Sequence, residues 1–267
     1  MSVPGLSLDP ATAAQQGNEW KASLEQELAE GWADFVDCPR RLAREGPFLL
    51  DVLGRPPARV LDAAMGIGCE AVFLREQGFD VVGNEISPSL RAVAAARAAA
   101  SATQLTLAST DWRGLRKGFG DSAFDSVLLL GNCLCLLRKQ RDRRAAAENI
   151  RAVCKAGGSV VVDERNFEYI LRNRDSILAG QFRYTGRVVY CGKTVKGTPV
   201  AIDDDCVRFV YKNIVSGVEF GCLDMHPFRR GELVSLFRAA GFREATVYSD
   251  FMKGYRPDCD FYTYVFR

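Results

Sequence analysis

The chain has 267 residues, enough for one large α/β domain with a full core, or for one domain with a sizeable insertion. Its 35 Lys and Arg against 33 Asp and Glu give a formal net charge of +2, which disfavours a nucleic-acid-binding protein. No apolar run reaches the roughly 18 residues of a membrane helix, and the N-terminus lacks a signal-peptide core. We expect a soluble, cytoplasmic protein that binds neither nucleic acid nor membranes.

The nine cysteines are scattered and form no C-x-x-C pair, and His226 is the only histidine. This distribution favours reduced thiols over disulfides or a zinc site. A single histidine also disfavours a His-based metal site and a Ser-His-Asp triad. We therefore expect no metal, and we interpret His226, which stands beside Pro227, as a structural residue.

The hydrophobic pattern predicts the elements in chain order. Residues 1–18 are small and polar and predict a flexible arm, and residues 19–52 show helical spacing that stops at the Gly54-Arg55-Pro56-Pro57 run. Strands and helices then alternate, with Ser87 as an N-cap before Pro88. The predicted strands are 58–64, 80–85, 105–110, 124–132 and 158–164, and the predicted helices are 69–77, 88–100 and 139–155.

The rhythm breaks over 166–200, and the chain then predicts two antiparallel strands, a helix and two last strands. These cover 203–214, 219–225, 229–240, 244–249 and 260–266. Alternating strands and helices indicate a doubly wound, mostly parallel sheet. We expect an arm at 1–18, N-terminal helices and a cofactor-binding α/β core at 19–165, an inserted β-rich substrate lid at 166–222, and C-terminal completion of the core sheet at 223–267.

Candidate ligand groups follow the first two strands, in "VLDAAMGIGCEAVFLREQGFDVVGNEIS". Gly66 and Gly68 follow the first strand, and Glu85 ends the second, where a carboxylate can accept both hydroxyls of a ribose. The turn lacks the third glycine of the dinucleotide fingerprint. Asp62 suits a cationic ligand, and S-adenosylmethionine carries both an ammonium and a sulfonium.

The next strand ends continue the series. In "STDW", Asp111 is placed to accept from an adenine amino group and Trp112 to cover the ring, although Trp112 is also compatible with a core aromatic. The run "LLLGN" ends the fourth strand. In this order the strand ends resemble the class I S-adenosylmethionine-dependent methyltransferases, and the resemblance implies a Rossmann-like sheet of seven strands.

Further segments resemble one branch of that superfamily, the glycine N-methyltransferases and the glycine/sarcosine N-methyltransferases. They are "VLDAAMGIG", "SVLLLGNCLCLL", "VVVDERNFEYIL", "DMHPFRRGELVSLFRAAGF" and "SDFMKGYRPDCDFYTYVF". The resemblance implies S-adenosylmethionine as cofactor, a small amino acid as substrate (glycine, sarcosine or dimethylglycine) and a setting in glycine betaine synthesis. Another small amine or carboxylate acceptor, a non-catalytic cofactor-binding protein, and homo-oligomerisation stay open.

The resemblance also assigns site residues. Arg165 matches the clamp for the substrate carboxylate, and Asn132 matches a polar contact to the substrate. Tyr190 and Tyr255 match tyrosines around the substrate and the sulfonium, and Arg41 matches the arginine that grips the methionyl carboxylate. The implied cofactor contacts are Trp32, Arg41, Asp62, Ala64, Gly66, Gly68, Glu85, Ile86, Asp111, Trp112, Leu130 and Asn132.

Other interpretations of these residues stay open from the sequence. Arg165 is also compatible with a structural ion pair to Asp163 or Glu164, Asn132 with a turn after Gly131, and the two tyrosines with core aromatics. The chain departs from the family in three places. Met65 replaces a small or thiol residue, Ile67 replaces a threonine, and no tyrosine precedes Trp32.

Overall fold

The computed structural model describes residues 31–181 and 194–267. The predicted arm at 1–18, most of the first predicted helix and Tyr190 lie outside these residues. Residues 31–35 are helical and precede α3 (Cys38–Val52), in which Asp37 is the N-cap and accepts from the Arg40 amide at 3.2 Å. The helix ends just before Gly54, where the sequence predicts a stop.

An eight-stranded sheet forms the main body, with the order β10-β9-β11-β5-β4-β1-β2-β3. Its strands are β1 (Arg59–Asp62), β2 (Asp80–Asn84), β3 (Thr106–Ala108), β4 (Phe124–Leu129), β5 (Cys154–Arg165), β9 (Ala245–Ser249), β10 (Met252–Lys253) and β11 (Phe261–Phe266). Strands β1 to β5 pair in parallel, while β11 runs antiparallel between β5 and β9. The predicted doubly wound, mostly parallel sheet is confirmed, and the two-residue β10 adds an eighth strand at its edge.

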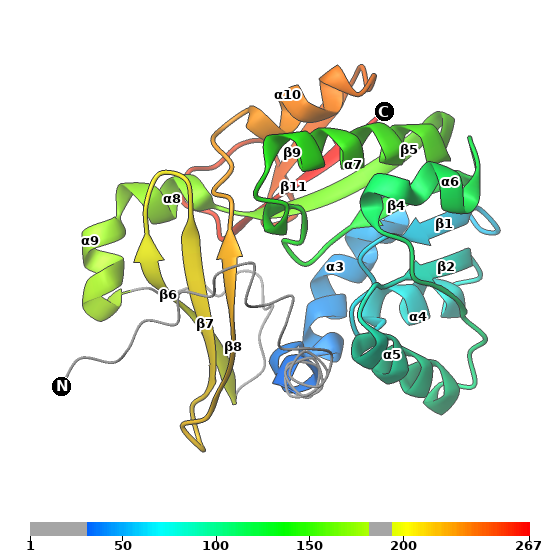
Figure 1. Cartoon of the computed structure of the whole chain (residues 1–267). Coiled ribbons are helices and arrows are strands. Elements are labelled where there is room, and N and C mark those ends of the chain that lie inside the picture. The colour runs from blue at the N-terminus through cyan, green and yellow to red at the C-terminus, as the bar shows by residue number, and fades with distance from the viewer. Residues whose placement is uncertain (1–30, 182–193) are drawn as a thin grey trace, which may run out of the picture.

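Helices cover the sheet on both sides. Figure 1 shows α7 and α10 beside the β5 and β11 half, and α4 and α5 beside the β1 to β3 half. The side chain of Ser87 accepts from the Leu90 amide at 3.3 Å, which confirms the predicted N-cap of α5. The helices are α4 (Cys69–Glu76), α5 (Pro88–Ala100), α6 (Leu115–Phe119), α7 (Gln140–Val153) and α10 (Glu232–Ala239), with short turns η1 (Trp112–Gly114) and η2 (Leu134–Leu136).

A separate antiparallel sheet stands beside the main body, with the order β6-β7-β8. It comprises β6 (Val195–Ile202), β7 (Val207–Asn213) and β8 (Glu219–Met225), and it follows α8 (Phe167–Arg172), α9 (Arg174–Ser176) and η3 (Ile177–Gln181). The sequence pattern predicts the last two strands and misses β6, in which Gly197 and Pro199 interrupt the alternation. Val207, Phe209 and Tyr211 of β7 are buried and join this sheet to the core.

One pair of cysteines corrects the expectation that all thiols are reduced. Cys38 begins α3, Cys69 begins α4, and the two form a disulfide with a Cα–Cα distance of 5.6 Å. No sequence motif pairs them, because only the packing of α3 on α4 brings these two helix starts together. The disulfide fixes α3 against the turn that follows β1.

The described residues contain neither a membrane-spanning helix nor a cluster of metal-binding side chains. None of their helices is both long enough and apolar enough to cross a bilayer. They also contain no group of three or more His, Cys, Asp and Glu side chains placed to hold a metal ion.

Candidate functional site

A cavity of about 250 Å³ lies at the carboxyl ends of the parallel strands, between α3 and the β7–β8 hairpin. This is the edge at which open α/β sheets bind ligands. Many of the residues singled out from the sequence line it, namely Trp32, Arg41, Ala64, Gly66, Glu85, Ile86, Trp112, Leu130, Asn132 and Arg165. The structure therefore brings residues from seven separate stretches of the chain to one cavity.

The carboxylate of Glu85 is fixed at this edge by two backbone donors. It accepts from the Gly66 amide at 3.0 Å and from the Ser87 amide at 2.8 Å. Burial raises the pKa of Glu85, and these two amide bonds oppose that rise. Nothing stands within 4 Å of the point that a Gly66 Cβ would occupy, so the turn leaves open space beside the carboxylate.

Gly68 has a different role from Gly66. Its backbone is left-handed, with φ +80°, and an added Cβ would lie 3.0 Å from the Ala94 side chain of α5. It does not line the cavity. The second glycine of the motif thus permits close packing of α5 on the start of α4, while Gly66 faces the open space.

The residues after β3 divide between the cavity and the surface. The indole N–H of Trp112 donates to the carbonyl of Ala63 at 2.6 Å, which holds its ring in the cavity wall. The Asp111 carboxylate lies outside the wall and accepts from the guanidinium of Arg113 at 2.7 and 2.8 Å, a bond that keeps its pKa below the ordinary value. The Trp112 ring is therefore available to contact a ligand in the cavity, whereas the Asp111 side chain is directed away from the cavity and toward Arg113.

A buried charged group occupies the α3 end of the cavity. The Nε atom of Arg41 lies 2.6 Å from a Glu45 oxygen and 2.7 Å from a Glu70 oxygen, and both Arg41 and Glu70 line the cavity. The buried Asp62 stands behind them, with its pKa raised by burial and then by the charge of Glu70, and it does not line the cavity. The wall thus offers a cation and an anion side by side.

Sequence reasoning missed Glu70. It lies in the first turn of α4, directly after the G-x-G turn. An acidic residue is electrostatically favoured at a helix start, and this helix starts at the ligand edge of the sheet. Its position after the glycine turn is therefore a signal that sequence reasoning can use.

The opposite end of the cavity is formed where β4 and β5 end. Asp163 accepts the backbone amides of Gly131 and Asn132 at 3.0 and 2.6 Å, and the side-chain oxygen of Asn132 accepts the Arg165 amide at 2.8 Å. Asn132 is left-handed, with φ 58°, a conformation that asparagine tolerates better than most residues. These bonds lock the two strand ends together.

The guanidinium of Arg165 is held between aromatic rings. Its central carbon lies 4.5 Å from the Phe209 ring centre and 5.1 Å from the Phe261 ring centre. In the same strand, Asp163 accepts backbone amides, and Glu164 accepts the Tyr264 hydroxyl at 2.7 Å. Arg165 is buried and still lines the cavity.

An aromatic and apolar wall closes the cavity on the side of the small sheet. Trp32, Phe35 and Tyr211 pack with ring centres 5.0 to 5.2 Å apart. The sequence does not single out Phe35, nor the residues of the small sheet that line the cavity, because their pattern is that of ordinary half-buried strands. The latter are Tyr211, Leu223 and Met225.

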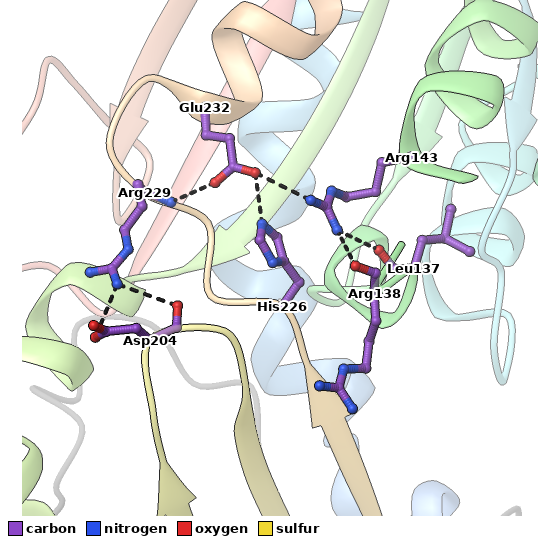
Figure 2. A network of polar contacts seen from close by, with 7 residues as sticks. All are labelled: Leu137, Arg138, Arg143, Asp204, His226, Arg229 and Glu232. Atoms are coloured by element: carbon purple, nitrogen blue, oxygen red, sulfur yellow. Dashed lines mark hydrogen bonds and ion pairs between the residues drawn. The ribbon is translucent and has the colours of Figure 1, made fainter. Parts of the chain in front are cut away.

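Tyr255 and His226 lie away from this cavity. The Tyr255 hydroxyl donates to Glu168, and its ring lies 3.8 Å from the Arg230 guanidinium, in a groove separate from the cavity. His226 bonds Glu232 through Nε2 at 2.7 Å, as Figure 2 shows, in agreement with its structural interpretation. Tyr190 lies outside the described residues.

Comparison with known proteins identifies the chain. A family model described as a methyltransferase domain matches residues 60–158. A glycine/sarcosine N-methyltransferase from Parasynechococcus marenigrum (strain WH8102) is 32% identical over 254 residues, which cover 95% of this chain and 87% of that protein. The chain belongs to the glycine/sarcosine N-methyltransferase family. It is an S-adenosylmethionine-dependent N-methyltransferase.

Two further proteins are similar to this member of the glycine/sarcosine N-methyltransferase family. The glycine/sarcosine/dimethylglycine N-methyltransferase of Actinopolyspora halophila is 35% identical over 89% of this chain, which spans only 41% of that longer protein. A solved S-adenosylmethionine-dependent methyltransferase from Clostridium acetobutylicum aligns with a TM-score of 0.65 at 14% identity, over 87% of this chain and 92% of the other. The latter shows the fold alone.

The cavity's groups suit S-adenosylmethionine. Beside the open turn at Gly66, the Glu85 carboxylate is an acceptor for ribose hydroxyls, and the indole of Trp112 is a flat apolar surface. Arg41 and Glu70 present the opposite charges that match an amino-acid head group. The glycine/sarcosine N-methyltransferase fold therefore meets the chemical needs of this cofactor with residues already in place.

Proposed function

We propose that this enzyme methylates the amine nitrogen of glycine and sarcosine, with dimethylglycine as a further acceptor, in steps that lead toward glycine betaine. The observation that carries the proposal is that Arg165 and Asn132 line the same cavity as Glu85 and Trp112. Groups suited to a carboxylate and groups suited to the cofactor thus share one enclosed space. The names of the related enzymes from Parasynechococcus and Actinopolyspora support the same acceptors.

Four residues hold the donor in this proposal. S-adenosylmethionine, when bound, supplies a methyl group on a positively charged sulfur. Glu85 accepts the ribose hydroxyls and Trp112 covers the adenine. Arg41 binds the methionyl carboxylate, while Glu70 binds its ammonium, and the carboxyl of Asp62, whose pKa burial raises, lies buried behind them. Charge-assisted bonds of this kind are the stronger hydrogen bonds in proteins.

Arg165 orients the acceptor. A planar guanidinium binds a carboxylate through two parallel bonds, and the flanking rings of Phe209 and Phe261 restrict its rotation. With the carboxylate held, the nitrogen two bonds away can move only by rotation about the bond between the carboxylate carbon and Cα. The side-chain oxygen of Asn132 accepts the backbone amide of Arg165, and this bond fixes the position of Arg165 at the strand ends.

Methyl transfer to a neutral amine requires positioning and exclusion of water more than proton abstraction. Tyr211 and Met225, from the small sheet, close the acceptor side with apolar surface. We infer that the predicted inserted segment acts as a substrate cover for this reason. Such a wall also tolerates the N-methyl groups of sarcosine and dimethylglycine.

The direct test is an acceptor panel with isotopically labelled S-adenosylmethionine. Glycine, sarcosine, dimethylglycine, β-alanine and methylamine are incubated separately, and the products are identified by mass. The proposal predicts labelled sarcosine, dimethylglycine and betaine, with β-alanine and methylamine poor acceptors. Preferential methylation of methylamine would reassign the enzyme to another small amine, and cofactor binding without turnover on any acceptor would indicate a binding protein.

A further inference from the structure

A second cavity, of about 580 Å³, lies outside the methyl-transfer site, and half of its lining residues are arginines. We call it the arginine groove. It is formed by α8, the start of α9, the turn before α10 and the loop after β10. Its lining residues are Glu168, Leu171, Arg172, Arg174, Arg229, Arg230, Tyr255 and Pro257.

One carboxylate holds two of these arginines side by side. Asp204 lies 2.9 Å from Arg174 and 3.1 Å from Arg229, and its backbone carbonyl also accepts from Arg229 at 3.3 Å. Figure 2 shows Arg229 held at its other end as well, where its backbone amide donates to Glu232 at 3.1 Å. The guanidinium is thus positioned before any ligand arrives.

The Glu232 carboxylate that holds this turn is itself anchored. His226 bonds it at 2.7 Å, and Arg143 lies 3.4 Å away with its own guanidinium bonded to the carbonyls of Leu137 and Arg138. This network ties the turn before α10 to the start of α7. This network therefore restrains the turn that forms one side of the arginine groove.

The other side is ordered by Tyr255. Its ring carries the Arg230 guanidinium at 3.8 Å, and its hydroxyl donates to Glu168. Burial raises the pKa of Tyr255, and the bond to Glu168 raises it further, so the phenol stays neutral. The stacked ring orients Arg230 toward the groove without neutralising it.

The charges of the lining residues and of their ion-pair partner Asp204 do not balance. Four arginines face the carboxylates of Glu168 and Asp204. Among the ion pairs of residues 31–181 and 194–267, none includes Arg172 or Arg230. Like charges gathered in a concave surface repel one another and raise the local concentration of anions.

We propose that the arginine groove binds a small organic oxyanion of at least two negative charges. Guanidinium forks match the oxygens of phosphates and carboxylates, and several of them converge here. The volume falls within the range of small-molecule sites, and Leu171, Pro257 and the Tyr255 ring offer apolar surface for the body of the ligand. The inference is independent of the methyl acceptor, because no groove residue lines the first cavity.

Isothermal titration calorimetry tests the proposal with pyrophosphate and with citrate, at an ionic strength held constant with sodium chloride. We compare the wild type with the double variant Arg172→Gln/Arg230→Gln, in which both replaced residues are exposed. Thermal unfolding checks that the double variant is folded. The matched control is Arg116→Gln, an exposed arginine of α6 paired with Asp121. We expect one equivalent of anion to bind, and the double variant to bind at least tenfold more weakly than the control.

The two anions distinguish the sources of the shared chemistry. Tighter binding of pyrophosphate identifies a phosphorylated metabolite, and tighter binding of citrate identifies a polycarboxylate; either result with the expected variant pattern supports the groove. The absence of saturable heat with both anions overturns the proposal. So does equal affinity in the wild type and the double variant, because the anion would then occupy another arginine such as Arg41 or Arg165.

Discussion

The side-chain oxygen of Asn132 accepts the backbone amide of Arg165 at 2.8 Å, so the loop after β4 holds the last residue of β5. Arg165 in turn presents its guanidinium to the cavity between two rings. Asn132 is therefore a positioning residue for the clamp as well as part of the wall.

Replacing Asn132 with glycine keeps the left-handed backbone and removes the acceptor for the Arg165 amide. We expect kcat/KM for sarcosine to fall about 10- to 100-fold, and the free energy of unfolding to fall by about 1 to 3 kcal/mol for the orphaned amide. Steady-state kinetics and denaturant unfolding measure the two effects. Wild-type kinetics in the glycine variant would show that the bond does not position the clamp.

Glu85→Ala tests the donor side. Loss of charge-assisted bonds to the ribose should cost on the order of 1.5 to 3 kcal/mol, which is about a 10- to 100-fold rise in the Kd for S-adenosylmethionine. The matched control is Asp121→Ala, an exposed acid of the same protein that pairs with Arg116. Calorimetry that gives the same Kd for a folded Glu85→Ala protein and for the control would remove Glu85 from the site.

Met65 fits this site because Gly83 of β2 lacks a side chain. A Cβ on Gly83 would overlap the Met65 sulfur, and Met65 lines the cavity. We expect Gly83→Ala to push Met65 toward the cofactor space and weaken S-adenosylmethionine binding. Adding Met65→Ala should restore affinity at least in part, whereas a double variant as weak as Gly83→Ala would mean that the strand itself is disturbed.

Much of this architecture is predictable from local patterns. The alternation of apolar strands and helices, the Ser87-Pro88 helix start and the order of polar strand ends suffice to predict the parallel sheet and its ligand edge. Glu85 and Trp112 are accessible to sequence reasoning because each lies at or just after the end of a predicted strand, and strand ends meet at one edge.

The remaining features depend on tertiary packing. The Cys38–Cys69 disulfide joins two helix starts that no motif connects. Tyr211 reaches the cavity only because the small sheet folds back over it, and the Asp111 side chain turns away because Arg113, two residues later, binds it. Tyr255 matches a family position in sequence, yet its contacts with Arg230 and Glu168 place it in the arginine groove.

Glu164 predicts a pH-dependent stability. Burial raises its pKa from 4.5 to about 8, so between these values the folded protein keeps a proton that the unfolded chain has lost. The folded state then binds more protons, and the free energy of unfolding falls as the pH rises, by up to about 1.4 kcal/mol per unit. Glu164→Gln retains an acceptor for Tyr264 and should show a shallower slope in denaturant unfolding from pH 5 to 8. Burial also raises the pKa of Glu45, so the Glu164→Gln variant should keep part of the pH dependence. Identical slopes in the wild type and in Glu164→Gln would contradict the assignment.

The most direct test of the central claim, that Arg165 clamps an amino-acid carboxylate, is kcat/KM for glycine and sarcosine in Arg165→Lys, measured beside the Kd for S-adenosylmethionine. A lysine keeps the charge but cannot form two parallel bonds or lie flat between Phe209 and Phe261. We predict a loss of at least about 100-fold in kcat/KM, equivalent to about 2.7 kcal/mol, with the cofactor Kd changed less than about threefold. A folded Arg165→Lys enzyme with wild-type kcat/KM on both amino acids would contradict the carboxylate clamp.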